Sequence, residues 1–366
     1  MTSRFLLAHH SNQRRLPLFS GSGANHNHFE PPDFFLYDPR ASASEQILPF
    51  PRLDAIIGPA TTICASCDGL LAISFAHFFF YVCNPTTSQF YHVNQVQGFG
   101  LLGLYPHRPT ADEYHLLMYR QIPFDEPLSL HEPTCYVITL GGSNSQRQPR
   151  CIGWPAATAV TSSSSSSSMP TGGAIVSPRC LFETLLSSSS VLVHGNLHLY
   201  LSRQQVGVSD DGSRKIMVFD TLAESIHFMA TPVVHPNPAD LFEMDGTLRM
   251  YSWNIGEEIV VVNMWVMEDY AMGFWKFMCQ VELPVAETID KLEFVYLRVV
   301  VVTEEKDVCV MVNTNDGVLH YDTKGRLLAN YNDDERRFFA ARHTLKPSLV
   351  PHSFFSMGAA MQGAAE

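Results

Sequence analysis

The sequence predicts an all-β fold, a β-propeller-like repeat of about six four-stranded sheet units. A unit made of a tight turn, an apolar strand and an aromatic strand ending in Asp or Asn recurs along the 366 residues. Successive copies start roughly 45 to 55 residues apart, with one gap of about 80, and such periods are typical of solenoids, propellers and arrays. Short strand signals alternate with Gly, Pro, Asn and Asp, and helix signals are almost absent. The long period favours a propeller over a sandwich or a barrel.

The clearest copy of the unit centres on Asp68 and Gly69. This pair is a two-residue turn signal, because Gly tolerates the positive φ of a tight hairpin and Asp tolerates it better than most residues. We therefore expect one strand to end near Cys67 and the next to begin at Leu70. The aromatic strand that follows should end before Pro85, which can donate no hydrogen bond to a sheet.

The same features return along the chain. The Gly turn and the alternating strand after it recur at residues 194–200 and 244–250. The aromatic strand ending in Asp or Asn occurs at residues 35–39, 81–85, 217–221 and 319–323. Degenerate copies lie at residues 137–140 and 262–266.

Strand candidates, taken in order, fill most of the chain. They lie at residues 34–37, 47–50, 64–67, 70–73, 78–84, 89–93, 99–105, 112–119, two within 131–154, 191–200, 216–220, 226–229, 241–244, 248–253, 259–267, 275–278, 294–302, 308–313, 318–321 and 327–331. We expect an early strand to pair with the last ones, because closure of the ring removes exposed strand edges that invite aggregation.

Composition sets the domain boundaries. Residues 1–30 are interpreted as an N-terminal leader or connector, because they end in a polar, Gly-containing linker. Residues 31–350 are expected to form the repeat domain, and residues 351–366 a C-terminal tail. Residues 156–190 contain two serine runs, which cannot bury enough apolar area to offset the entropy of ordering. This segment is expected to be an extended surface loop inserted in the domain.

Charge and hydropathy limit the classes of partner. The formal net charge is -12, and no basic run is longer than Arg14-Arg15 or Arg336-Arg337. Nucleic-acid binding needs clustered Lys and Arg, so no nucleic-acid partner is expected. No stretch approaches the roughly 18 to 20 apolar residues that span a bilayer, so no membrane partner is expected. The 8 scattered cysteines suit a reducing compartment, and we expect a cytoplasmic or nuclear protein.

The recurrent motifs resemble the F-box-associated domain of plant F-box proteins. The motifs that carry the resemblance lie at residues 66–71, 83–87, 103–106 with 110–116, 193–198, 218–220 and 264–270 with Trp275, ending with 321–322 and 348–350. Their order and spacing match that domain across about residues 31 to 350. The resemblance implies a kelch-like β-propeller that selects the protein to be ubiquitinated.

In that family an N-terminal F-box binds a Skp-type adaptor of a cullin-RING (SCF-type) ubiquitin ligase. Nothing before Phe34 has the length or periodicity of such a three-helix segment, so the F-box is expected to be missing or truncated. A Skp-type adaptor and a cullin are therefore expected as partners only if an F-box is supplied upstream. Residues 3–10 could form two helical turns, and Leu16–Phe19 could add a strand.

Two motifs suggest a metal or a cofactor, and both have simpler interpretations. Cys64 and Cys67 have the spacing of half a zinc site or a redox pair, but no second Cys/His pair has ligand spacing. Residues 98–103 match the dinucleotide-binding fingerprint. That fingerprint needs a following helix, which Pro106 and Pro109 forbid. We therefore predict no cofactor and no metal.

Residue types that could carry chemistry are present without a constellation. Four aspartates recur at equivalent turns, which indicates a structural role repeated in each unit: Asp68, Asp220, Asp245 and Asp322. Four histidines lie in strands, where hydrogen-bonded core or surface residues outnumber ligands: His92, His115, His198 and His320. Four tryptophans are expected to fill gaps between sheets, although an exposed one could be a binding hot spot: Trp154, Trp253, Trp265 and Trp275.

The sequence thus assigns no catalytic residue and leaves the substrate-binding residues open. The leading hypothesis is a protein-interaction module with an unidentified protein client and not an enzyme, with its coupling to the ligase left open. The alternative is a propeller scaffold or a small-ligand-binding protein unrelated to ubiquitination. An enzyme on the propeller is the third hypothesis, because a fold does not fix a function.

Overall fold

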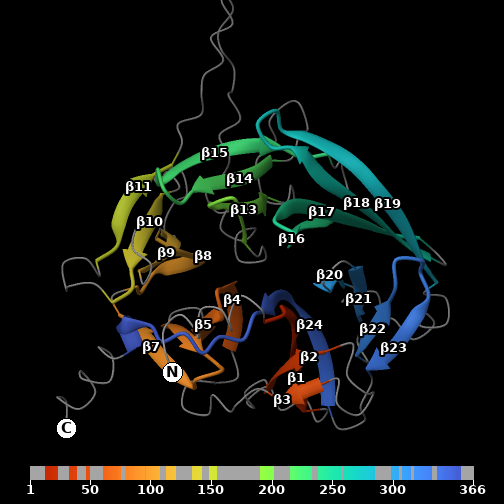
Figure 1. Cartoon of the computed structure of the whole chain (residues 1–366), viewed down its shortest axis with the longest axis horizontal. Helices are drawn as coiled ribbons and strands as arrows, with labels where there is room; N and C mark the ends of the chain where they lie inside the picture. Colours follow the sequence, from red (N-terminus) through yellow and green to blue (C-terminus); the bar gives the residue numbers. More distant parts are fainter. Residues whose placement is uncertain are drawn as a thin grey trace, which may run out of the picture.

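Six four-stranded antiparallel sheets are arranged around an axis as the blades of a β-propeller (Figure 1). The predicted fold class is confirmed. The computed structural model describes residues 13–23, 33–38, 47–49, 61–75, 79–94, 96–107, 113–120, 134–141, 148–154, 190–201, 215–232, 238–256, 259–284, 298–304, 307–314, 317–331 and 336–355. The serine runs at 162–168 and 187–189 lie outside these residues, so the expected loop remains a prediction.

Each blade is numbered by its place in the chain. Blade 1 contains β24 (Arg336–Leu345), β1 (Leu16–Gly23), β2 (Asp33–Tyr37) and β3 (Ile47–Pro49). Blade 2 contains β4 (Thr61–Cys67), β5 (Leu70–Phe75), β6 (Phe79–Asn84) and β7 (Gln89–Val93). Blade 3 contains β8 (Phe99–Pro106), β9 (Tyr114–Arg120), β10 (Cys135–Thr139) and β11 (Arg150–Gly153).

The second half of the ring repeats this order. Blade 4 contains β12 (Val191–Val193), β13 (Asn196–Leu201), β14 (Lys215–Asp220) and β15 (Ser225–Ala230). Blade 5 contains β16 (Ala239–Met244), β17 (Thr247–Ile255), β18 (Ile259–Asp269) and β19 (Phe274–Pro284). Blade 6 contains β20 (Arg298–Glu304), β21 (Asp307–Asn313), β22 (Val318–Tyr321) and β23 (Leu327–Tyr331).

The ring closes within blade 1, where the two ends of the chain share one sheet. Strand β1 lies between β24 and β2, and Phe19 pairs with Ala340 on one side and with Phe35 on the other. The expected pairing of an early strand with the last ones is confirmed. Strand β1 lies inside residues 1–30, for which the sequence predicted a leader, and it completes blade 1 by pairing with β2 and β24.

The C-terminal boundary also differs from the expected one. In the described part of the chain, helix is confined to residues 353–355. Phe354 is fully buried, and its ring lies 5.6 Å from that of Tyr91 in blade 2 and 6.2 Å from that of Tyr114 in blade 3. The first residues of the expected tail therefore belong to the core, because an aromatic pair fills the gap between two blades. No helix in the described residues has the length and apolar character needed to cross a membrane.

The hydrophobic core is divided among the six blade interfaces. Clusters of buried side chains lie between blades 1 and 2, 2 and 3, 3 and 4, 4 and 5, 5 and 6, and 6 and 1. Central strands are covered on both faces, so Leu70–Ile73 in β5 and Tyr114–Tyr119 in β9 are buried at every position. This explains why these strands have continuous apolar runs where a half-exposed strand would alternate.

The described tight turns of blades 2, 4, 5 and 6 share one side of the ring. In a four-stranded antiparallel blade, the connection of strands one and two and that of strands three and four lie at the same end. We call this side the turn face. Asp68, His194 and Asp245 have φ of 50°, 50° and 53°, and each is followed by a Gly with positive φ, as the predicted two-residue turns require.

Candidate functional site

A groove of about 630 Å³ lies on the turn face of blade 5. It is lined by residues from β17, β18, β19 and the connections beside them: His194, Thr247, Val266, Met267, Glu268, Tyr270, Lys276, Phe277 and Met278. Residues of β18 and β19 supply its apolar lining. The sequence left the substrate-binding residues open, and we look for them among these lining residues.

Strand irregularities coincide with this groove. Strands β18 and β19 have 11 residues each, and their pairing shifts register between Met264 and Trp265 and again between Met267 and Asp269. A β-bulge bends its strand, increases the local twist and redirects side chains. Two such shifts within six residues explain how one end of a regular sheet is opened into a groove.

Charged and aromatic side chains form the polar part of the groove. Lys276 Nζ donates to Glu268 Oε1 at 2.8 Å, and this hydrogen bond raises the pKa of Lys276. The Tyr270 hydroxyl lies 2.6 Å from His198 Nε2 of blade 4. Burial, followed by the charge of Asp220, raises the pKa of Tyr270 to about 12. Tyr270 therefore lines the groove as an uncharged phenol, and its contact with His198 links blade 5 to blade 4.

The groove continues onto an exposed apolar strip along β19 and the turn before it. Met272, Phe274, Phe277 and Met278 expose 79%, 57%, 52% and 39% of their surface. Strand β19 is the last strand of its sheet. Groups of exposed large apolar side chains mark interaction sites more often than isolated ones do.

The turn aspartates have the structural role that the sequence predicts. Asp220 Oδ1 accepts hydrogen bonds of 2.8 Å from the N–H groups of Leu222 and Ala223. Asp322 Oδ1 likewise accepts 2.9 Å bonds from the N–H groups of Lys324 and Arg326. These two carboxylates therefore stabilise the turns that they begin, whereas Asp68 and Asp245 occupy positive-φ positions in the turns between strands one and two of blades 2 and 5.

The motifs that suggested a metal or a cofactor have structural surroundings of another kind. Cys64 and Cys67 are free cysteines in β4, and the Cys64 thiol donates to the Thr62 carbonyl oxygen over 3.6 Å. Residues 99–106 form β8 and not the strand-to-helix junction of a dinucleotide site. The strand interpretation of both motifs is confirmed.

The tryptophans and strand histidines are less uniform than predicted. Of the four tryptophans, Trp253 alone is buried; Trp154, Trp265 and Trp275 are half-buried, and each packs against a core cluster between two blades, as expected. His115, His198 and His320 are buried, and His92 is exposed.

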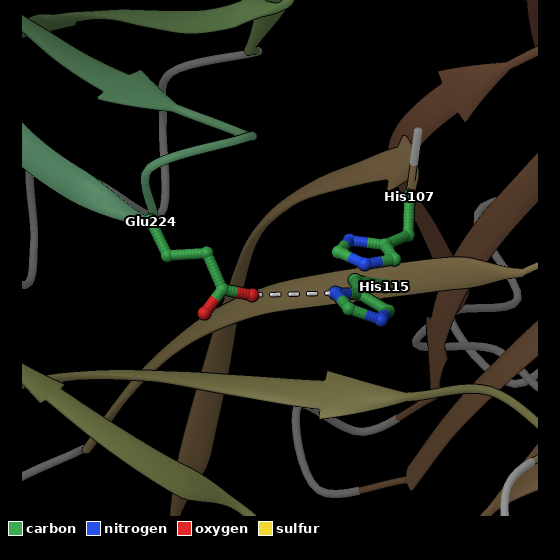
Figure 2. A group of neighbouring side chains, drawn as sticks. All are labelled: His107, His115 and Glu224. Atoms are coloured by element: carbon green, nitrogen blue, oxygen red, sulfur yellow. Dashed lines mark ion pairs between the residues drawn. The ribbon is translucent and has the colours of Figure 1, made fainter. Parts of the chain in front are cut away.

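Three side chains in the described residues could together hold a metal ion: His107, His115 and Glu224 (Figure 2). Their ligand atoms all lie within 4.8 Å of one another. Burial lowers the pKa of His115, against the opposing contact with Glu113, so its imidazole is held neutral. The sequence prediction missed His107 and Glu224, because both lie in connections between strands and 117 residues of chain separate them. Metal-binding motifs are recognised by short spacings along the chain, and residues of two different blades have no such spacing.

Comparison with known proteins gives no family. No protein-family model and no curated protein matches the chain. Solved structures that it resembles include a DUF4784 family protein from Bacteroides caccae, at 11% identity and a TM-score of 0.39 over 87% of this chain and 73% of that one.

Two enzymes are also among the similar structures. The acylaminoacyl peptidase of Pyrococcus horikoshii has 9% identity and a TM-score of 0.39 over 87% of this chain and 45% of that one. A family 117 glycoside hydrolase of Zobellia galactanivorans has 9% identity and a TM-score of 0.32 over 67% of this chain and 69% of that one. None of the three is an F-box-associated domain, and likeness at this level assigns neither a family nor an activity.

Proposed function

We propose that this chain is a protein-interaction module that binds an extended segment of a client protein in the blade 5 groove. The observation that carries the proposal is the continuity of the apolar groove with the exposed edge strand β19. Aromatic residues and Met are enriched at the centres of protein interfaces, and both line this site. The alternative, a small-ligand site, would leave the exposed strip outside the groove without a role.

The edge strand suggests how the client is held. Among the described strands β19 pairs with β18 alone, so its outer edge can accept a further strand. An added strand gains main-chain hydrogen bonds for affinity, and its alternate side chains give specificity. Phe277 and Met278 line the groove, so side chains of an added client strand would contact them there.

The ion pair of Glu268 and Lys276 supports a role in orientation more than in affinity. Both side chains are about half exposed, at 49% and 59%. An exposed pair of this kind contributes little to the stability of a fold, so it can re-pair with charges of a client at little cost. A client segment with one charge of each sign beside its apolar residues would fit best.

The resemblance of the sequence to plant F-box-associated domains supports a wider role for the module. With an F-box supplied upstream, a Skp-type adaptor and a cullin would couple the captured client to a ubiquitin ligase. In this proposal the propeller performs recognition and the ligase performs the chemistry, so the chain itself is not an enzyme.

Proximity labelling in plant cells tests the proposal with a matched pair of variants. Phe277→Ala removes an aromatic ring from the groove, and Leu327→Ala removes an equally exposed side chain from the edge strand of blade 6; both residues are 52% exposed. We expect the first variant to lose the main labelled client by about tenfold or more, because truncating an interface hot spot costs roughly 2 kcal/mol. The second should label it as the unaltered chain does.

The other outcomes distinguish the alternatives. Equal labelling by both variants would exclude the groove as the client site. Ligase subunits among the labelled proteins would support coupling to ubiquitination. Absence of both ligase subunits and a stable client would favour the small-ligand or scaffold alternative, and turnover of a substrate panel by the purified chain would favour an enzyme.

A further inference from the structure

A second site lies on the turn face between blades 3 and 4. His107 follows the last residue of β8, His115 is the second residue of β9, and Glu224 ends the turn between β14 and β15 (Figure 2). The His107 N–H donates to the Glu113 carbonyl oxygen at 2.7 Å, which closes the β8–β9 connection and brings the two imidazoles together. The rings stack with centroids 4.4 Å apart and planes 15° from parallel. Glu224 faces them from the neighbouring blade.

Two polar atoms of this group are buried without a hydrogen-bond partner in the described residues. They are His107 Nδ1 and Glu224 Oε1. An unsatisfied buried polar group costs roughly 1 to 3 kcal/mol, and a native protein normally satisfies it with water or an ion. Because both atoms belong to one group of ligand-type side chains, a single bound species would satisfy both.

The remaining contacts decide which atom of each side chain can face a metal ion. His115 Nε2 lies 3.2 Å from Thr139 Oγ1 and 3.4 Å from Glu113 Oε1, and a proton on Nε2 can be donated to either oxygen. His115 Nδ1 then presents its lone pair toward Glu224 Oε1, 3.5 Å away, with the Tyr105 hydroxyl at 3.4 Å as its competing partner. Arg150 occupies the other carboxylate oxygen of Glu224.

The His115 ring has the surroundings of an established zinc ligand. A ligating imidazole usually donates its other N–H to a carboxylate or a similar acceptor, which fixes the ring and its tautomer. Around a tetrahedral zinc ion with bonds of about 2.1 Å, ligand atoms lie roughly 3.4 Å apart. The distance of 3.5 Å between His115 Nδ1 and Glu224 Oε1 already meets this requirement. Because the lone pair of an imidazole nitrogen lies in the plane of its ring, the stacked His107 ring must turn relative to His115 to bind the same ion.

We propose that His107, His115 and Glu224 bind one Zn²⁺ ion, which links blade 3 to blade 4 on the turn face. Two imidazoles and one carboxylate suit zinc, whereas Mg²⁺ and Ca²⁺ prefer oxygen ligands alone. Three protein ligands leave the fourth position for water or for a donor atom from a bound partner. This site shares no residue with the client groove, so the zinc proposal does not depend on the proposed client binding.

Zinc titration of the metal-free full chain tests this site. We expect one Zn²⁺ per chain by calorimetry and a rise in melting temperature with zinc concentration, because a ligand that binds only the folded state stabilises it. Co²⁺ in its place should give the visible spectrum of a nitrogen and oxygen site. A thiolate charge-transfer band would show that cysteines bind the metal instead and would overturn the proposal.

Three variants separate the site from adventitious histidine binding. His107→Gln and Glu224→Gln each remove one ligand from a half-buried position, so the metal-free melting temperature should change little. Each should weaken zinc binding about tenfold or more, equivalent to at least 1.4 kcal/mol. His92→Gln, on the exposed face of β7, is the control and should bind as the unaltered chain does. Absence of zinc binding by the unaltered chain, or equal binding by all variants, would overturn the proposal.

Discussion

The hydroxyl of Tyr37 lies 2.9 Å from Nδ1 of His320, although 283 residues separate them in the sequence. Tyr37 belongs to blade 1 and His320 to blade 6, so the pair crosses the interface at which the ring closes. The Tyr331 hydroxyl donates to the Tyr37 oxygen at 2.8 Å, and the ring of Phe19 stacks on that of Tyr37 with centroids 5.1 Å apart. One phenol therefore joins the first and last blades through both polar and apolar contacts.

Tyr37→Phe should destabilise the protein by about 1 to 3 kcal/mol. The substitution keeps the buried ring but leaves His320 Nδ1 without this partner, and an unsatisfied buried group costs about that much. Urea unfolding gives the free energy directly. Tyr81→Phe is the control, since Tyr81 is half-buried and its ring stacks on the exposed imidazole of His92. Equal losses in the two variants would show that the Tyr37 hydroxyl does not stabilise the closing interface.

The fold could be predicted because its main features are local. Asp68 and Gly69 define a hairpin within two residues, and the same turn chemistry recurs in several blades. The group of His107, His115 and Glu224 could not be predicted, because its residues meet only after the ring has formed. Glu224 belongs to an ordinary turn in the sequence and faces His115 only across a blade interface. The exposure of Phe277 likewise depends on β19 being an edge strand, which the sequence does not reveal.

Gly69→Ala should be far more destabilising than Gly246→Ala. Both glycines have positive φ, 84° and 72°, so both substitutions carry a similar backbone strain of roughly 1 kcal/mol. A Cβ at residue 69 would lie 2.8 Å from the Lys346 carbonyl oxygen, whereas one at residue 246 would meet nothing within 4 Å. The difference in unfolding free energy between the variants thus measures the packing of the C-terminal segment on blade 2. Equal destabilisation would indicate that this segment can move away.

Trp253→Ala should cost about 3 to 5 kcal/mol, the usual range for truncating a buried aromatic residue. Trp253 is 5% exposed, and its ring stacks on that of Tyr251 with centroids 5.7 Å apart. Trp265→Ala should cost less, because that residue is half-buried, yet it should weaken client binding through its contact with Phe277, whose ring is 5.8 Å away. Thermal unfolding and client labelling of the two variants check both statements. The reverse order of stability would contradict the assignment of Trp253 to the core.

Stability should fall as the pH decreases from about 6.5 to 4, in part because His198 and His320 are buried. Burial lowers the pKa of each imidazole to about 4, and the weaker opposing effects are hydrogen bonds to backbone groups for His198 and the charge of Asp322 for His320. In the unfolded chain an imidazole has a pKa of about 6.5, so the unfolded state binds more protons within this window. The contribution of each neutral imidazole is complete above pH 6.5 and is lost as the pH falls to 4, by at most about 3 kcal/mol for each histidine. The free energy of unfolding in urea at several pH values measures this slope.

In His198→Gln the slope between pH 6.5 and 4 should be shallower by the share of one imidazole, whereas His92→Gln, at an exposed position, should change it less. An unchanged slope in His198→Gln would mean that acid destabilises the propeller through its carboxylates and not through this histidine.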